Sequence, residues 1–138
     1  MIQRIQTIWL LLATTCVFLT MQFSTYVGNS KDDLPMAFLN GKYNALFTIF
    51  TTAVGVATLI SIFLFRNRRL QIKINVLAVF MQLGLISLYF FEIQKFIGKG
   101  AFALMGSLLH FIVIVSLLLS LKGILADNKI IKDSDRLR

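Results

Sequence analysis

Four apolar stretches, each long enough to cross a bilayer, constrain this chain more than any other feature. A hydrocarbon core about 30 Å thick requires about 20 apolar residues in a helix. The stretches cover residues 5–27, 43–65, 70–94 and 101–121, and charged residues occur only in the third, at Lys73 and Glu92. In a chain of 138 residues that is 57% hydrophobic, four such helices leave too little polar surface for a soluble fold. We therefore expect an all-α membrane protein with four transmembrane helices.

The distribution of basic residues predicts the orientation of these helices. An even number of spans places both termini on one side, and that side carries ten of the 14 Lys and Arg residues. Because basic residues favour the cytoplasmic side, both termini are expected to be cytoplasmic. The connections are short, which favours an antiparallel up-and-down bundle. The sequence thus predicts a single domain over residues 1–138, with a short polar cytoplasmic tail at about 126–138.

The connection between the second and third stretches is strongly basic, with Arg66, Arg68, Arg69 and then Lys73. Its first role is to fix the topology. Anionic lipid headgroups at the cytoplasmic face are the expected contacts, at about 1 kcal/mol per basic residue. Nucleic-acid binding is not expected, because the segment lacks interleaved aromatic residues and a folded platform.

Only the connection between the first and second stretches has room for structure of its own. Asp32 or Asp33, ahead of Pro35, is typical of a helix start, and Asn40 with Gly41 is typical of a helix end. One interpretation is a short segment lying on the outer membrane interface. The alternative is a plain solvated loop.

Several polar residues fall near the middle of the predicted spans: Thr14, Thr51, Gln82 and His110. Gln82 and His110 lie at similar depths on neighbouring antiparallel helices, so a hydrogen bond between them is expected. An ionisable group within a membrane is a functional-site hypothesis by default. The alternative is that His110 stays neutral and joins helices through hydrogen bonds. The absence of a second His, Asp or Glu near its depth favours this packing role.

The remaining reactive residues form no pattern that is typical of a catalytic, metal-binding or cofactor-binding site. Glu92 lies near the outer boundary, and Lys95 three residues later predicts an interfacial ion pair. A single Cys and a single His exclude a disulfide framework and a zinc site with several such ligands. Motifs for phosphate binding, metalloprotease chemistry or an activated nucleophile are missing. We therefore expect no cofactor and no enzymatic activity.

The chain also resembles a known family. The similarity is clearest in three segments: Met1-Ile2-Gln3-Arg4-Ile5-Gln6-Thr7, Arg68-Arg69-Leu70-Gln71 and Ser134-Asp135-Arg136-Leu137-Arg138. These segments are similar to those of short four-span integral membrane proteins of Bacteroidota, grouped as a domain of unknown function. The resemblance implies a multi-pass protein of the bacterial inner membrane, and it implies no mechanism.

Two functions from different classes fit these features best. The first is a structural or accessory subunit that contacts another membrane protein, which suits the small size and the scarcity of reactive groups. The second is a small transporter or channel that uses the mid-membrane polar residues as a homo-oligomer, because four spans leave little room for a pore. An enzyme acting on lipid is a third and weaker alternative, since only Glu92, Lys95 and Lys99 form a polar cluster at an interface.

Overall fold

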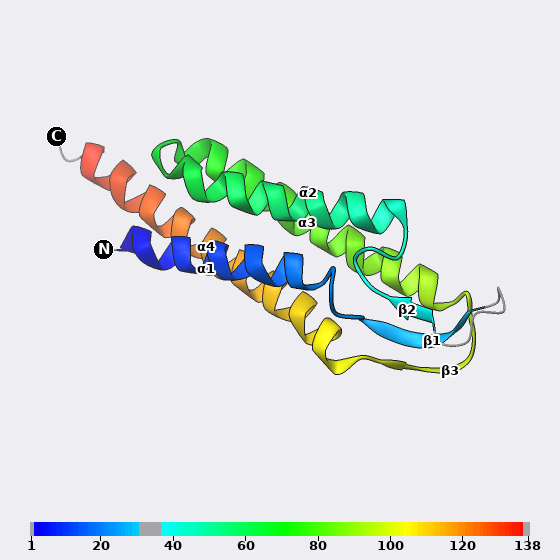
Figure 1. The fold of residues 1–138 in the computed structure, drawn as a ribbon. Coiled ribbons are helices and arrows are strands. Elements are labelled where there is room, and N and C mark those ends of the chain that lie inside the picture. The colour runs from blue at the N-terminus through cyan, green and yellow to red at the C-terminus, as the bar shows by residue number, and fades with distance from the viewer. Residues whose placement is uncertain (1, 31–36, 137–138) are drawn as a thin grey trace.

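The computed structural model describes residues 2–30 and 37–136, which form four α-helices, a short 3-10 helix and three strands (Figure 1). The elements follow in the order α1 (Ile2–Leu19), β1 (Tyr26–Ser30), β2 (Ala37–Leu39), α2 (Ala45–Phe63), η1 (Leu64–Arg66), α3 (Arg68–Ile93), β3 (Phe96–Phe102) and α4 (Leu104–Arg136). The helices lie side by side, and the strands gather at one end of them.

Within the described chain, three helical segments are long and apolar enough to cross a membrane: Ala45–Arg66, Arg68–Ile93 and Leu104–Asn128. The first predicted span differs from this pattern. Helix α1 ends at Leu19, its apolar part Ile5–Leu19 is shorter than the other three, and Tyr26 and Val27 belong to a strand. Where the sequence predicts four apolar helices each long enough to cross a bilayer, the described residues form three such helices and a shorter one.

The helices contact one another in a closed cycle, in which α1 packs against α4 and α2, and α3 packs against α2 and α4. Their shared core contains Leu10, Val17, Val54, Val113 and Leu117, each at most 1% exposed. The α2–α3 connection and both ends of the chain lie at one end of the molecule, opposite the sheet (Figure 1). Sequential helices therefore run in opposite directions.

The connection at Asn67 is tight, as the sequence predicts. The 3-10 helix η1 ends at Arg66, the Asn67 amide donates to the Leu64 carbonyl at 2.9 Å, and α3 begins at Arg68. At the other end of α2, the Asn44 side chain caps the helix by accepting from the Ala45 amide at 2.7 Å. These local signals fix both ends of α2.

The three strands form an antiparallel sheet in the order β2-β1-β3, which the sequence analysis did not predict. Tyr26 pairs with Leu39 on one side and with Phe102 on the other. Phe38 and Leu39, expected on an interfacial helix or a loop, lie in β2, and the predicted helix start at Asp32, Asp33 and Pro35 lies outside the described residues. A strand forms here because β1 offers backbone partners along both of its edges.

The fourth predicted span also differs at both of its ends. Ala101 and Phe102 belong to β3, so the helix begins at Leu104. At the other end, the residues predicted as a polar tail continue α4 as far as Arg136. The buried positions Val113, Leu117, Ser120, Ile124 and Asp127 recur every three or four residues, so the packed face extends past the apolar stretch.

Backbone contacts join the sheet to the helices at Thr25. Its amide donates to the Leu39 carbonyl at 2.7 Å, and its carbonyl accepts from the Ala103 amide at 2.9 Å. The adjacent Ser24 backbone lies directly over Gly106, where an added Cβ would stand 2.1 Å from the Ser24 carbonyl oxygen. Gly106 is thus the point at which α4 and the start of the sheet touch without an intervening side chain.

We expect Gly106→Ala to destabilise the protein by about 1–3 kcal/mol, because the backbone of residues 24–25 must move to admit the methyl group. Gly84→Ala is the matched control, since its Cβ would meet only the Phe50 ring at 3.5 Å, and Ala is the better helix former. Thermal unfolding in detergent checks this. Equal Tm values for the two variants would contradict the close contact at Gly106.

Candidate functional site

The interior of the helices holds many polar side chains, while their outer surface is apolar. Buried polar residues include Thr14, Thr51, Thr58, Asn75, Gln82, His110, Ser116 and Ser120. Conversely, Phe63, Phe80 and Phe111 are more than 60% exposed. This polar-in, apolar-out pattern is the reverse of a soluble domain and suits helices surrounded by lipid.

Gln82 on α3 and His110 on α4 meet as the sequence predicts, with Gln82 Nε2 at 2.9 Å from His110 Nδ1. An amide nitrogen can only donate, so with this orientation of the amide Nδ1 is the acceptor and the ring proton lies on Nε2. The Tyr89 ring packs edge-on against the imidazole, with centroids 4.9 Å apart. The contacts with Gln82 and Tyr89 therefore hold the His110 ring in place. The Nε2–H group of His110 is not used in the bond to Gln82.

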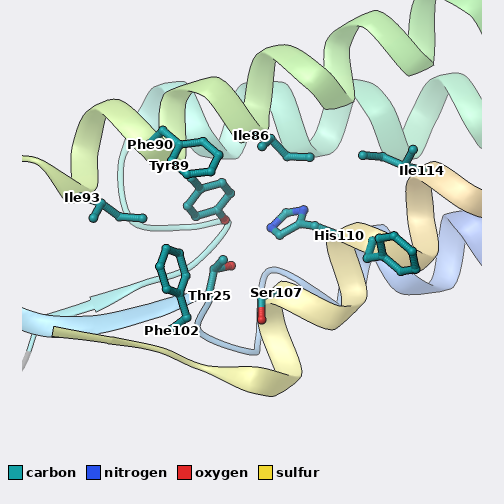
Figure 2. Close-up of a pocket in the computed structure, with 10 residues that line it drawn as sticks. Thr25, Ile86, Tyr89, Phe90, Ile93, Phe102, Ser107, His110 and Ile114 are labelled. Atoms are coloured by element: carbon teal, nitrogen blue, oxygen red, sulfur yellow. The ribbon is translucent and has the colours of Figure 1, made fainter.

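A pocket of about 220 Å³ lies between α3, α4 and the segment that leads into β1. Figure 2 shows Tyr89, Thr25 and His110 directed toward one another within it. The pocket is lined by Thr25, Ile86, Tyr89, Phe90, Ile93, Phe102, Ser107, His110, Phe111 and Ile114. Its rim includes Phe90, Phe102 and Phe111, all of which are largely exposed on the apolar outer surface.

Polar atoms at the floor of this pocket lack hydrogen-bond partners elsewhere among the described residues. These are the Nε2 atom of His110 and the hydroxyls of Thr25 and Tyr89, which interact only with each other, and the three residues are at least 94% buried. Gln82 Oε1, behind the imidazole, is also without a partner there. Buried polar groups are normally paired, so this cluster is the strongest candidate site in the described chain.

Thr14 and Thr51, the other two predicted mid-membrane residues, do not join the pair of Gln82 and His110. The Thr14 hydroxyl lies 2.9 Å from that of Thr58 on α2. Thr51 donates to the Phe47 carbonyl of its own helix at 2.7 Å. The predicted polar layer is thus divided into separate contacts, of which only the Gln82 and His110 contact adjoins the pocket.

At the end of the helices near the α2–α3 connection, Asp127 of α4 joins three elements. Its carboxylate accepts from Gln6 Nε2 of α1 at 2.8 Å and lies 3.9 Å from Arg68 Nη1 of α3. Arg68 is therefore partly neutralised, while Arg66 and Arg69 of the predicted basic turn are exposed. Lys73, on the next turn of α3, is exposed as well.

At the opposite end, Glu92 and Lys95 form the predicted ion pair, with Oε2 and Nζ 2.6 Å apart. The hydrogen bond from Lys95 to the Glu92 carboxylate raises the pKa of Lys95 above its ordinary value, with a further contribution from the negative charge. Because Lys95 is exposed, the pair contributes little to stability. Among the described residues no cluster of His, Cys, Asp and Glu could hold a metal ion.

Sequence reasoning missed Asp127, Thr25 and Tyr89 as members of these sites. Asp127 lay in the segment predicted to be a tail, although its spacing from Ser120 and Ile124 continues the buried face of α4. Tyr89 lies seven residues after Gln82 on the same face of α3. Thr25 carried no comparable signal, because its position depends on the unpredicted sheet.

The fold and the site define a small, mostly helical protein with helices apolar enough to cross a membrane and polar side chains directed inward. The chain belongs to the family described as Domain of unknown function (DUF4293), whose model matches residues 2–137. No curated protein and no solved structure matches the chain.

We expect Asp127→Ala to lower the free energy of unfolding by about 1–3 kcal/mol, because it leaves Gln6 and Arg68 without their shared acceptor. Glu92→Ala is the control, since its partner Lys95 is exposed to solvent and losing this pair costs less than about 1 kcal/mol. Unfolding in mixed detergent micelles measures both. A loss for Asp127→Ala no larger than that for Glu92→Ala would show that the contact between α1, α3 and α4 contributes nothing.

Proposed function

We propose that this protein is a multi-pass protein of the bacterial inner membrane and a structural or accessory subunit of a membrane complex. In this proposal all four helices cross the bilayer as an antiparallel bundle, with both termini cytoplasmic and the sheet at the outer face. One observation carries the accessory role: many polar side chains of the interior contact a side chain or a backbone carbonyl of another helix, and these contacts join the helices. Polar side chains that join helices in this way stabilise the bundle, and few polar side chains then remain for catalysis.

The short helix α1 is compatible with a transmembrane position. Its 18 residues span about 27 Å, close to the hydrocarbon thickness of about 30 Å. Non-helical backbone within a membrane is tolerated where protein covers it. Thr20 and Thr25 are at least 94% buried, and the Gly41 amide donates to the Thr20 carbonyl at 3.0 Å. The segment after α1 can therefore lie in protein at the outer edge of the bilayer.

The charges at the two ends support the proposed orientation. Arg66, Arg68, Arg69 and Lys73 lie at the end that also carries both termini. In the proposed orientation these residues face anionic lipid headgroups of the cytoplasmic leaflet. Lys42 and Lys95 lie near the sheet, at the end that would face outward.

Cysteine labelling tests the orientation. In a Cys16→Ala background, a membrane-impermeant maleimide should label exposed Lys42→Cys in intact spheroplasts, and it should label exposed Asn67→Cys only after permeabilisation. Asn67 and Lys42 are at opposite ends of α2, so one serves as the control for the other. Labelling of both positions from outside, or of Asn67→Cys alone, contradicts the proposed topology.

The accessory role predicts a stoichiometric partner. Gentle extraction of the tagged protein from its native membrane, followed by mass spectrometry, should recover another membrane protein in a fixed ratio. An unrelated four-helix membrane protein with the same tag is the control for non-specific capture. Recovery of a lone homo-oligomer would contradict this role and favour the second candidate, a small transporter or channel, which the unpartnered atoms of Gln82 and His110 also suit.

A further inference from the structure

The pocket between α3 and α4 has unused hydrogen-bonding capacity at its floor. The polar atoms of Thr25, Tyr89 and His110 come from three different segments of the chain and point into one space (Figure 2). A merely structural pair such as Gln82 and His110 needs only one ring nitrogen. The hydroxyls of Tyr89 and Thr25 interact with each other, so one can donate to the other. One hydroxyl donor and the second ring nitrogen then remain buried without a partner among the described residues. An occupant that bonds them would remove the cost of leaving them unpaired.

These atoms can donate hydrogen bonds, so the occupant of the pocket must present a hydrogen-bond acceptor. With the Gln82 amide nitrogen facing Nδ1 of His110, Nδ1 is the acceptor and Nε2 carries the hydrogen that can be donated into the pocket. The hydroxyls of Tyr89 and Thr25 can also donate. The complementary group is an oxygen with two lone pairs, of which a carbonyl is the simplest. Since the described lining includes no Asp, Glu, Lys or Arg, a neutral head is favoured over an ionic one.

The size and the rim of the pocket restrict the rest of the occupant. A volume of about 220 Å³ exceeds the ~150 Å³ of a cavity that binds benzene, so one substituted ring or a short acyl segment can enter. The walls include Ile86, Ile93 and Ile114. The exposed rings of Phe90 and Phe111 lie on the apolar outer surface, so the pocket opens toward hydrocarbon.

We propose that this pocket binds an amphiphile that presents a neutral carbonyl oxygen to Tyr89, Thr25 and His110 and keeps its apolar part against the isoleucine walls and the phenylalanine rim. The carbonyl belongs either to a quinone ring or to an acyl ester, and these two sources share the same recognition. The binding does not require the accessory role proposed above. The two lone pairs of the carbonyl oxygen then accept from His110 Nε2 and from the hydroxyl donor that the Tyr89–Thr25 pair leaves free.

Two matched pairs of probes test this proposal with the full-length protein in lipid nanodiscs. Duroquinone and durene share a tetramethyl ring and differ in the two carbonyl oxygens. Methyl laurate and tridecane are the corresponding ester and alkane. Equilibrium binding is measured against protein-free nanodiscs, so that partition into lipid is subtracted. We expect at least one carbonyl probe to bind about tenfold more tightly than its hydrocarbon partner.

The identity of the carbonyl probe that binds distinguishes a quinone source from an acyl ester. Equal binding of each carbonyl probe and its hydrocarbon partner overturns the proposal and indicates that water occupies the polar floor. Absence of binding by all four probes overturns it as well.

Two conservative variants locate the binding site. Tyr89→Phe and Thr25→Val each remove one hydroxyl while preserving shape, and each should reduce the carbonyl preference about three- to tenfold. Tyr43→Phe is the control, because Tyr43 is exposed and does not line the pocket. An unchanged carbonyl preference in both Tyr89→Phe and Thr25→Val, with folding intact, places any binding elsewhere and overturns the assignment.

Discussion

The pairing of polar groups away from water is the constraint on which this structure depends. In apolar surroundings a polar side chain has no solvent partner, so it must find one within the protein. The chain meets this requirement at several levels along the helices, from Gln6 and Asp127 at one end to Gln82 and His110 near the other. Each of these contacts joins two different helices, so satisfying the polar groups also stabilises the packing of the bundle.

The sheet extends the same principle to the backbone. Residues 20–25 leave the helical conformation, and their amides and carbonyls then require partners. The amides of residues 20–23 bond back to carbonyls at the end of α1. The hydrogen bonds of Thr25 with Leu39 and Ala103 hold β2 and the start of α4 against β1. The same segment brings the Thr25 hydroxyl opposite Tyr89 and His110. The pocket therefore exists because the chain departs from a simple helical hairpin at this end.

Much of the helical part could be predicted from the sequence, because apolar length and short connections depend on local composition. The turn at Asn67 and the contact of Gln82 with His110 follow from spacing alone. The sheet could not be predicted, because β1 and β3 are about 70 residues apart and their pairing depends on the helices that bring them together. The first stretch appeared long because apolar residues suit a buried strand as well as a helix, and hydropathy does not distinguish the two.

The polar groups of Thr25, Tyr89 and His110 share one open pocket, whereas the unpartnered Ser61 hydroxyl and Asn75 amide oxygen do not line it. Asn75 contacts Ser120 and Gln71 donates to the Ser61 carbonyl, so polar residues deeper between the helices are at least partly satisfied. Among residues 2–30 and 37–136, two hydroxyls and a ring nitrogen converge on open space beside an aromatic rim only near the sheet. A fold that needed these residues only for packing could use Phe at 89 and Val at 25 at no cost in buried volume. Their polar atoms are therefore best explained by a molecule that enters the pocket from the bilayer.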